Sequence, residues 1–331
     1  MKGFVRRLID CKNYYCNISS EARWLNSKKW AVGNLFFDYK RQITVTEQSG
    51  NDLTDYQVLV ELNSSNFDFS HAKSDGSDIR FHDGSNLLDY WIEKWDSSNQ
   101  EAKIWVKVPS IPASSSTSFY MYYGNPDVAS ASNGEDTFEF FDDFEDGTID
   151  ENKWSLSASV GDWYEENGTM NHAYGNYRLE MLSSIELGIS DNFVLRTRLK
   201  EDDSKDIGCA ISWDGQWDSG NLNQGYLICW GDAGTKRKII RYDNGSKNLL
   251  SAIDGNAPSQ WQIVEIIRKG GLIRFYYDGT NYDEVNDATY YHNRIGLYQW
   301  GTFDHAHFDW ILIRKYTDPE PSVSIGSEET P

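Results

Sequence analysis

The sequence predicts an all-β protein built from two antiparallel β-sandwich domains, and two features carry that prediction. Short segments alternate apolar and polar residues between clusters of Asn, Asp, Ser, Gly and Pro, whereas no long helical period follows Tyr39. The small, polar stretch VASASNGEDT, residues 128–137, separates two sets of such segments and is typical of a linker. With 331 residues, the chain is long enough for each domain to bury its own core.

The predicted strands follow one another along both domains. In the first domain, 36–127, we expect strands over residues 41–46, 56–62, 78–83, 88–95, 101–109 and 117–124. In the second domain, 138–317, we expect strands over residues 192–200, 207–213, 225–230, 237–243, 261–270, 272–279, 294–300 and 307–316. Residues 1–35 form an N-terminal extension with one short helix capped by Ser19 or Ser20. Residues 318–331 are rich in Pro, Ser and Glu, which predicts a flexible tail.

The composition excludes some classes of protein. The formal net charge of −20 at pH 7 argues against nucleic-acid binding, which needs basic patches. No apolar stretch is long enough to span a membrane, and the basic N-terminus lacks the sustained apolar run of an export signal. Aromatic residues make up 15% of the chain, and side chains of this kind suit strands and surfaces that face sugars.

Two parts of the chain resemble known families. The segment from Tyr39 to Pro126 contains LTDYQVLVEL, SDGSDIRF, LDYWIEKW, IWVKVP and YMYYGNP, and it resembles the domain of unknown function 2341 family. That family occurs in secreted or surface-anchored prokaryotic proteins, frequently just ahead of a lectin-like sandwich. The segment from Phe138 to Tyr316 looks like a concanavalin-like or laminin-G-like jelly roll, because FFDDFEDGTIDENKWS and HFDWILIRKY are similar to its first and last strands. Members of that superfamily range from sugar-binding modules to glycoside hydrolases, so the fold alone leaves the activity open.

A hydrolase of this fold would resemble the laminarinase-like enzymes, whose Glu-x-Asp-x-x-Glu signature puts three carboxylates on one strand face. A retaining pair of carboxylates must flank the glycosidic bond at about 5–5.5 Å. Here Glu201 and Asp203 are followed by Asp206 where the signature has Glu, and the surrounding KEDDSKD is typical of a solvated turn. The chain also lacks Gly-x-Ser-x-Gly, His-Glu-x-x-His and Cys-x-x-Cys. We therefore expect no catalytic residues and a protein that is not an enzyme.

The last predicted strand raises two hypotheses about metals. His305, His307 and Asp309 in DHAHFDW share one strand face and are ligand types for a transition metal, but one strand rarely completes a site, so an ordinary exposed face is expected. Related jelly rolls often hold a structural calcium ion where the first strand meets the last. That resemblance implies a Ca²⁺ site with oxygens from Asp309 and from Asp143 or Asp142. Solvated acids at strand ends are the alternative.

The segment DIGCAISWDGQWDSGNLNQGYLICWGD, residues 206–232, predicts a β-hairpin. Centring the turn on Ser219 places Cys209 directly opposite Cys229, within reach of a disulfide in an oxidising compartment. In a reducing compartment the two cysteines would stay small buried thiols. Cys11 and Cys16 fit either a small local disulfide or two unrelated thiols.

The same register predicts a ligand-binding face on this hairpin. It places Trp230 and Tyr226 on the outward face beside the small residues of the first strand, which would form a shallow groove for a sugar ring. Trp217, in the turn, is a further candidate for ligand contact. Ordinary packing inside the sandwich is the alternative for all three aromatics.

The leading hypothesis is a non-catalytic binding module, extracellular or on a cell surface, that binds a glycan or surface polysaccharide through its second domain. The alternative is a structural subunit or spacer of a cell-surface or virion fibre, whose partners are other copies of itself or envelope proteins. The lack of a visible export signal favours a virion component or a gene model that is incomplete at its N-terminus. A glycoside hydrolase is the weakest hypothesis, and structural calcium is the only cofactor expected.

Overall fold

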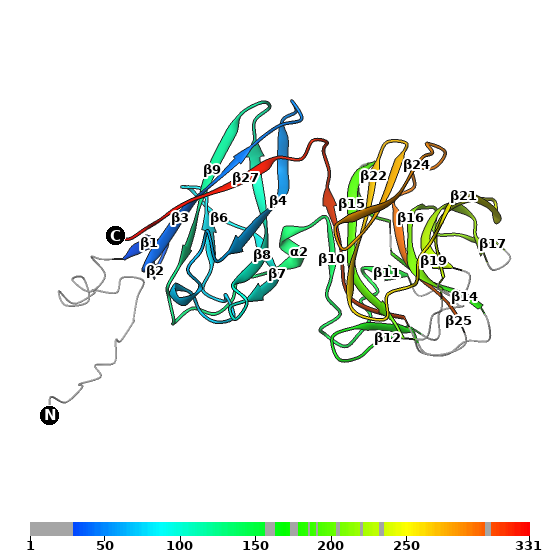
Figure 1. Ribbon diagram of the computed structural model, residues 1–331, viewed down its shortest axis with the longest axis horizontal. Coiled ribbons are helices and arrows are strands. Elements are labelled where there is room, and N and C mark those ends of the chain that lie inside the picture. The colour runs from blue at the N-terminus through cyan, green and yellow to red at the C-terminus, as the bar shows by residue number, and fades with distance from the viewer. Residues whose placement is uncertain are drawn as a thin grey trace.

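The computed structural model describes residues 29–155, 163–172, 178–184, 186–189, 191–202, 206–218, 221–231, 235–301 and 306–331. These residues form strands almost throughout, in two antiparallel sandwiches that lie side by side (Figure 1). The predicted all-β fold class is confirmed. The expected helix near Ser19 and Ser20 lies outside the described residues, as do Cys11 and Cys16. Within the described ranges, no helix is both long enough and apolar enough to cross a membrane.

The first sandwich packs two sheets, in the strand orders β27-β3-β9-β5-β6 and β4-β8-β7, around one apolar core. Its strands are β3 (Tyr39–Thr46), β4 (Leu53–Asn63), β5 (Arg80–His82), β6 (Leu87–Leu88), β7 (Tyr90–Asp96), β8 (Glu101–Ile111), β9 (Ser116–Tyr123) and β27 (Ser322–Glu329). A separate ribbon joins β1 (Trp30–Val32) to β2 (Leu35–Phe37), and Phe69–His71 form a short 3₁₀ helix. Alternation sets the core, because Val60 and Leu62 of β4 are buried while Glu61 and Asn63 are exposed.

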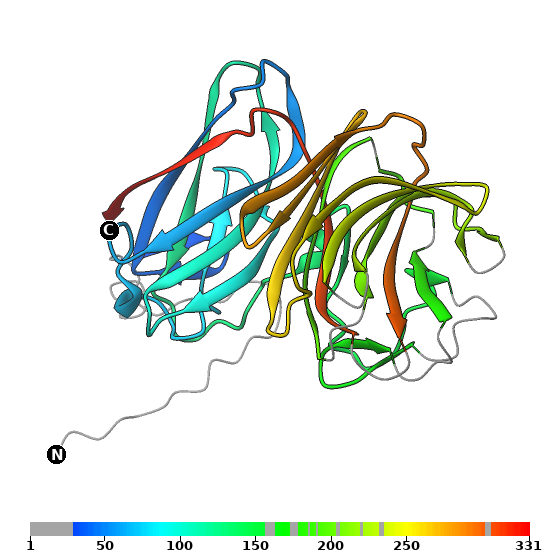
Figure 2. The ribbon, with the colours of Figure 1, turned by 45° about the vertical axis from the view of Figure 1, so that its right-hand side comes forward.

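The C-terminal segment is a strand of the first sandwich, so the predicted flexible tail is wrong. β27 pairs antiparallel with β3, with Val323 opposite Val45 (Figure 2). Val323 and Ile325 pack against the core, and the Glu328 carboxylate accepts a hydrogen bond from the Tyr123 hydroxyl at 2.7 Å. The prediction failed because local composition carries no information about a partner strand at the other end of the chain.

The second sandwich also packs two sheets. The near sheet, which faces the first sandwich, contains β12 (Trp163–Glu165), β13 (Met170–His172), β26 (Ala306–Lys315), β15 (Asn192–Glu201), β22 (Gln262–Lys269), β23 (Leu272–Tyr277) and β24 (Thr280–Asn286), with β10 (Phe140–Asp142) paired to β26. The far sheet contains β11 (Trp154–Ser155), β14 (Arg178–Ser184), β25 (Arg294–Gly301), β16 (Asp206–Trp213), β19 (Gln224–Gly231), β20 (Lys236–Asp243) and β21 (Ser246–Asp254). A small ribbon pairs β17 (Trp217–Asp218) with β18 (Asn221–Leu222).

The segment predicted as a linker, 128–137, packs on the first sandwich. It ends in α2 (Gly134–Thr137), which begins after Asn133, whose side chain accepts from the first backbone N–H groups of the helix. The backbone N–H of Asn133 donates to the Tyr90 carbonyl at 2.8 Å, and Arg80 donates to the Ala129 carbonyl. The chain between the sandwiches is therefore tied to β7 and β5.

An aromatic cluster joins the two sandwiches. It contains Trp91 and Trp105 of the first sandwich with Phe138, Phe141, Trp310 and Leu312 of the second. Beside it, the buried Arg196 side chain of β15 forms ion pairs with Glu93 of β7, at 2.7 Å, and with Glu265 of β22. Apolar burial together with a buried ion pair fixes the two sandwiches against each other.

Candidate functional site

The register of the central hairpin differs by one residue from the predicted one. Cys229 lies opposite Gly208, and Cys209 lies opposite Ile228. Because side chains alternate along a strand, this shift puts the two cysteines on opposite faces of the far sheet. Cys209 packs in the core between the sheets, Cys229 packs on the outward face, and the two are not joined by a disulfide. The predicted Cys209–Cys229 disulfide is therefore wrong.

The same shift turns the predicted ligand-binding aromatics inward. Trp230 is 1% exposed and Tyr226 is 0% exposed, and both belong to the core between the two sheets. The ring of Trp230 lies 5.4 Å, centroid to centroid, from Phe275 of the near sheet. Their prediction as groove residues is wrong. Trp217 begins β17, and its side chain lies outside the described part of the structure.

The structure explains Gly208 by close strand packing and not by the predicted sugar-binding groove. A Cβ atom added to it would lie 2.2 Å from the Ile228 carbonyl oxygen and 2.6 Å from Cys229 Cα. The glycine therefore permits the close approach of β16 and β19, and it leaves no room for a sugar ring.

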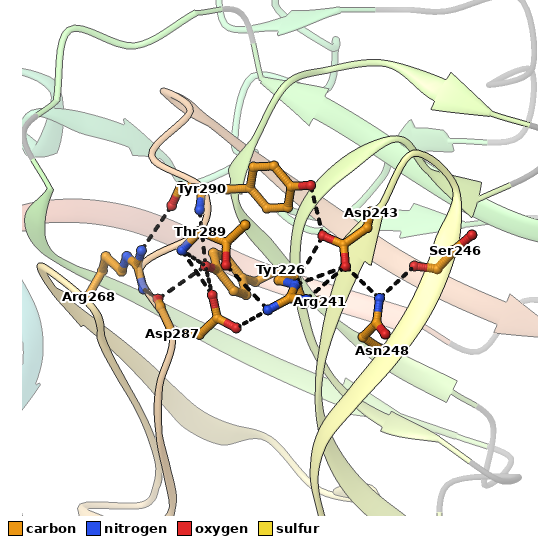
Figure 3. Close-up of polar contacts among 9 residues, drawn as sticks. All are labelled: Tyr226, Arg241, Asp243, Ser246, Asn248, Arg268, Asp287, Thr289 and Tyr290. Carbon is orange, nitrogen blue, oxygen red and sulfur yellow. Dashed lines mark hydrogen bonds and ion pairs between the residues drawn. The ribbon is translucent and has the colours of Figure 1, made fainter.

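Tyr226 instead fixes a loop on the molecular surface, residues 287–293, between β24 and β25. Its hydroxyl donates to Asp287 Oδ1 at 2.7 Å and accepts from the backbone N–H groups of Thr289, at 3.1 Å, and Tyr290, at 3.2 Å (Figure 3). A phenol buried in the sandwich thus satisfies three polar groups of the loop. These contacts anchor the start of the 287–293 loop.

Charged side chains hold the same loop. Arg241 of β20 pairs with Asp287 and with Asp243, and the Tyr290 hydroxyl donates to Asp243 at 2.8 Å (Figure 3). Burial opposes ionisation of Asp287, but hydrogen bonds from Thr289, Tyr226 and Arg241 outweigh it and lower its pKa to about 2. The hydrogen bond from Arg241 lowers the pKa of Asp243 as well. Both carboxylates are therefore ionised acceptors near neutral pH.

Arg268 of β22 connects the buried part of this network to an exposed ring. Its side chain is fully buried and donates to the backbone carbonyls of Asp287 and Tyr290, each at 2.9 Å. Its guanidinium carbon lies 4.9 Å from the ring centroid of Tyr226 and 4.9 Å from that of Tyr291. Such cation–π contacts hold aromatic rings in place.

Tyr291 presents its ring to solvent. Of the large apolar side chains in the described part of the chain, Leu87, Leu249 and Tyr291 are exposed, and Tyr291, 40% exposed, is the aromatic one. Tyr290 and His292 on either side are partly buried and stack on each other with ring centroids 5.7 Å apart. Sequence reasoning missed this site, although two adjacent tyrosines in the polar segment DATYYHN between two strands were a usable signal.

The carboxylates weighed for hydrolysis do not share one strand face. Glu201 ends β15 in the near sheet and is 1% exposed, whereas Asp206 begins β16 in the far sheet. Asp203 lies outside the described residues. Glu201 and Asp206 therefore lack the one-strand arrangement of the Glu-x-Asp-x-x-Glu signature.

The acids predicted to bind calcium line one pocket but have other partners. Asp143 and Asp309 border a pocket of ≈ 590 Å³ together with Arg198, which donates to Asp309 at 2.5 Å. Asp142, the alternative ligand, accepts from the Trp154 indole N–H at 2.7 Å. Among the described residues, no group of three or more His, Cys, Asp or Glu could hold a metal ion. Because the Arg198 charge already neutralises Asp309, this pair fits calcium poorly, and the calcium site stays a prediction.

The structure shows hydrogen-bond partners for one of the two histidines at the last predicted strand. His307 Nδ1 lies 2.6 Å from Asn171 Oδ1, and His307 Nε2 lies 2.9 Å from Asp202 Oδ2. His305 lies outside the described residues. The side chain of His307 therefore belongs to a hydrogen-bond network on the outer side of the near sheet.

Comparison with known families identifies part of the chain. Residues 75–157 match the family described as Domain of unknown function (DUF2341), so the predicted resemblance is confirmed there. The match begins later than Tyr39 and continues past the segment 128–137 into the second sandwich. No curated protein matches the chain.

Solved structures similar to the chain include jelly-roll domains. The carbohydrate-binding module CBM66 from Bacillus subtilis is 13% identical, with 53% of this chain and 95% of that chain covered and a TM-score of 0.38. A Bacillus licheniformis beta-glucanase is 13% identical, with 54% and 98% covered and a TM-score of 0.43. An endo-beta-1,3-glucanase from Pyrococcus furiosus is 13% identical, with 55% and 95% covered and a TM-score of 0.42.

Proposed function

We propose that the protein is a non-catalytic binding module, extracellular or at a cell surface, that binds a glycan through Tyr291 and its neighbours in the 287–293 loop. The observation that carries the proposal is the contact of Tyr291 with the buried guanidinium of Arg268. Through that contact, an exposed aromatic ring is fixed to the core of the second sandwich.

The chemistry of the loop suits a carbohydrate. An aromatic ring packs against the apolar face of a sugar, and polar groups around it bind the hydroxyls. Tyr290 and His292 supply such polar groups beside Tyr291, because both are partly exposed. A ring that is already held in place loses little conformational entropy on binding, and this favours affinity.

The acids of this loop support binding in preference to hydrolysis. A glycosidase needs one carboxylic acid that stays protonated near neutral pH while its partner is ionised. Asp287 and Asp243 are both held by Arg241, and the pKa values of both are lowered. Neither acid can therefore serve as the proton donor of such a pair.

A glycan array compares the wild type with two variants. Tyr291→Ala should lose binding to the glycans that the wild type selects, because the stacking surface is gone. Leu87→Ala, which removes a 52% exposed side chain of the first sandwich, is the control and should bind as the wild type does. Absence of wild-type binding to any glycan, or equal binding by Tyr291→Ala, would refute the proposed site. Release of reducing sugar from a bound glycan would refute a non-catalytic role.

A further inference from the structure

The five-stranded sheet of the first sandwich has an outward face with the chemistry of a ligand site. This sheet lies on the side of the first sandwich away from the second, so the described part of the second sandwich does not cover it (Figure 1). On β27, β3 and β9, alternate side chains belong to the core or pack against it, and the residues between them point outward. We call these outward residues the outer face: Ser322, Ser324 and Glu329 of β27, Lys40, Gln42, Thr44 and Thr46 of β3, and Ser116, Ser118, Tyr120 and Tyr122 of β9.

The outer face carries little charge in a strongly acidic chain. The chain has a formal net charge of −20, but the outer face contains one acid, Glu329, and one base, Lys40. Their side chains form an ion pair at 3.3 Å, so the face is neutral as a whole. A neutral, polar surface favours an uncharged, polar ligand, because a charged ligand would find no opposite charge left to pair with.

One half of the outer face is a regular grid of hydroxyl groups. Two rows run across the three strands, with Ser322, Thr46 and Ser116 in one and Ser324, Thr44 and Ser118 in the other. Thr46 Oγ1 lies 2.9 Å from Ser116 Oγ. Thr44 Oγ1 lies 3.2 Å from Ser118 Oγ. Neighbouring strands are about 4.8 Å apart, and alternate residues of one strand are about 6.7 Å apart. Since a hydroxyl both donates and accepts, such a grid can bind the repeated hydroxyls of a polymer.

The other half of the outer face holds two tyrosines. The rings of Tyr120 and Tyr122 are partly exposed, with centroids 6.2 Å apart. Lys40 Nζ lies 4.4 Å from the centroid of the Tyr120 ring. Phe37 and His82 flank the Tyr122 ring, with centroids at 5.9 and 6.5 Å. Within the described ranges, neither phenol oxygen has a hydrogen-bond partner and neither is buried, so both reach solvent. Neighbours therefore hold both rings in place while their hydroxyls stay available to a ligand.

Aromatic rings beside hydroxyl groups suit a carbohydrate. A ring packs against the apolar face of a sugar, and the hydroxyls form hydrogen bonds with its rim. The outer face spreads these groups along three strands of one sheet instead of gathering them in a pocket. Such an open face buries little of one small molecule, so it favours a ligand whose units repeat over the whole face. The surface of an insoluble polysaccharide has that property.

We propose that the outer face binds the surface of an insoluble, uncharged polysaccharide and is a second glycan site, separate from the 287–293 loop. Tyr120 and Tyr122 pack against sugar rings, and the grid of Ser and Thr hydroxyls binds the sugar hydroxyls beside them. The 287–293 loop belongs to the second sandwich and shares no residue with the outer face. Each site can therefore bind without the other.

Adsorption to particles of microcrystalline cellulose, chitin and beta-1,3-glucan tests the proposal. The fraction of protein that stays in solution after the particles are pelleted gives the affinity. The wild type should adsorb to at least one of these polymers, and Tyr120→Ala/Tyr122→Ala should adsorb more weakly by about tenfold or more. Tyr120→Phe/Tyr122→Phe keeps both rings and should adsorb within a few-fold of the wild type.

Tyr291→Ala is the reciprocal control. It removes the exposed ring of the 287–293 loop and should adsorb to the particles as the wild type does. Tyr120→Ala/Tyr122→Ala should in turn keep wild-type binding on the glycan array, so the two sites can fail separately. Adsorption should persist between about 0.05 and 0.5 M salt, because the outer face is neutral. Thermal melts of all variants exclude misfolding as the cause of lost adsorption.

Four results would overturn the proposal. The first two are a wild type that adsorbs to none of the polymers, and a Tyr120→Ala/Tyr122→Ala variant that adsorbs as the wild type does. Equal loss of adsorption in Tyr291→Ala would assign the polymer to the 287–293 loop instead. Self-association of the wild type that Tyr120→Ala/Tyr122→Ala abolishes in sedimentation velocity would assign the outer face to a second copy of the chain.

Discussion

The guanidinium carbon of Arg268 lies 4.9 Å from the ring centroid of Tyr291, which joins a fully buried cation to an exposed aromatic side chain. Arg268 is itself fixed by two carbonyls of the 287–293 loop, so the ring is held by the same network that holds the loop. An exposed ring with this support is prepared for ligand contact before a ligand arrives.

Two buried tyrosines on neighbouring strands make a matched pair of variants. Tyr226→Phe removes the hydroxyl that bonds Asp287, Thr289 and Tyr290, so it should lower the free energy of unfolding by about 1–3 kcal/mol. Tyr242→Phe removes a buried hydroxyl with no hydrogen-bond partner among the described residues, so stability should stay the same or rise. Urea denaturation measures both, and equal losses in the two variants would contradict the role given to Tyr226.

A substitution at Gly208 tests whether β16 and β19 approach each other as closely as the structure shows. Gly208→Ala should lower the free energy of unfolding by about 1–3 kcal/mol or more, because the new Cβ would meet the backbone of β19. Gly188→Ala is the control, since a Cβ atom there has no neighbour within 4 Å, and it should leave stability unchanged within about 0.5 kcal/mol. A neutral Gly208→Ala would show that the two strands are further apart than described.

Much of the fold follows from the sequence because it depends on period-two alternation. Most of the longer strands of both sandwiches were predicted from that pattern. The faces of the hairpin were not, because a shift of one residue exchanges them, and the turn position that sets the register is weakly encoded. Trp230 and Tyr226 were therefore placed outside when they lie inside.

Two other errors arise from contacts between distant parts of the chain. The composition of β27 is that of a mobile tail, and only pairing with β3 makes it a strand. The role of Tyr291 depends on Arg268, which is more than twenty residues earlier and belongs to another strand. Local sequence patterns do not report such pairings.

The junction between the sandwiches should depend on Glu93. Its side chain is 2% exposed and accepts from Arg196 and from the Trp105 indole N–H at 2.7 Å. Glu93→Ala removes the buried acceptor that the Arg196 guanidinium and the Trp105 indole N–H share. The free energy of unfolding should therefore fall by about 3–5 kcal/mol. Lys94→Ala removes an exposed ion pair with Glu101 and should cost about 0–1 kcal/mol. Chemical denaturation compares them, and similar small losses would contradict a buried ion pair at the junction.

Glu165 should make stability depend on pH. Burial, then a hydrogen bond to Asp146 and the nearby negative charges, raises the pKa of Glu165 to about 7 in the folded protein. A raised pKa gives a contribution that is complete below the unfolded value, near 4.5, and is lost as pH rises through 7. The melting temperature of the wild type should therefore fall between pH 5 and 8 relative to Glu165→Gln. Parallel pH profiles for the two proteins would contradict this pKa.

Isothermal titration calorimetry of Tyr291 variants against the best glycan of the array tests the central claim most directly. Tyr291→Phe keeps the ring and should bind within a few-fold of the wild type, whereas Tyr291→Ala should bind at least tenfold more weakly, or about 1.4 kcal/mol. The unfolding free energy should be unchanged in Tyr291→Phe and lower by about 1 kcal/mol in Tyr291→Ala, which loses the cation–π contact with Arg268. Wild-type affinity in Tyr291→Ala would contradict the account.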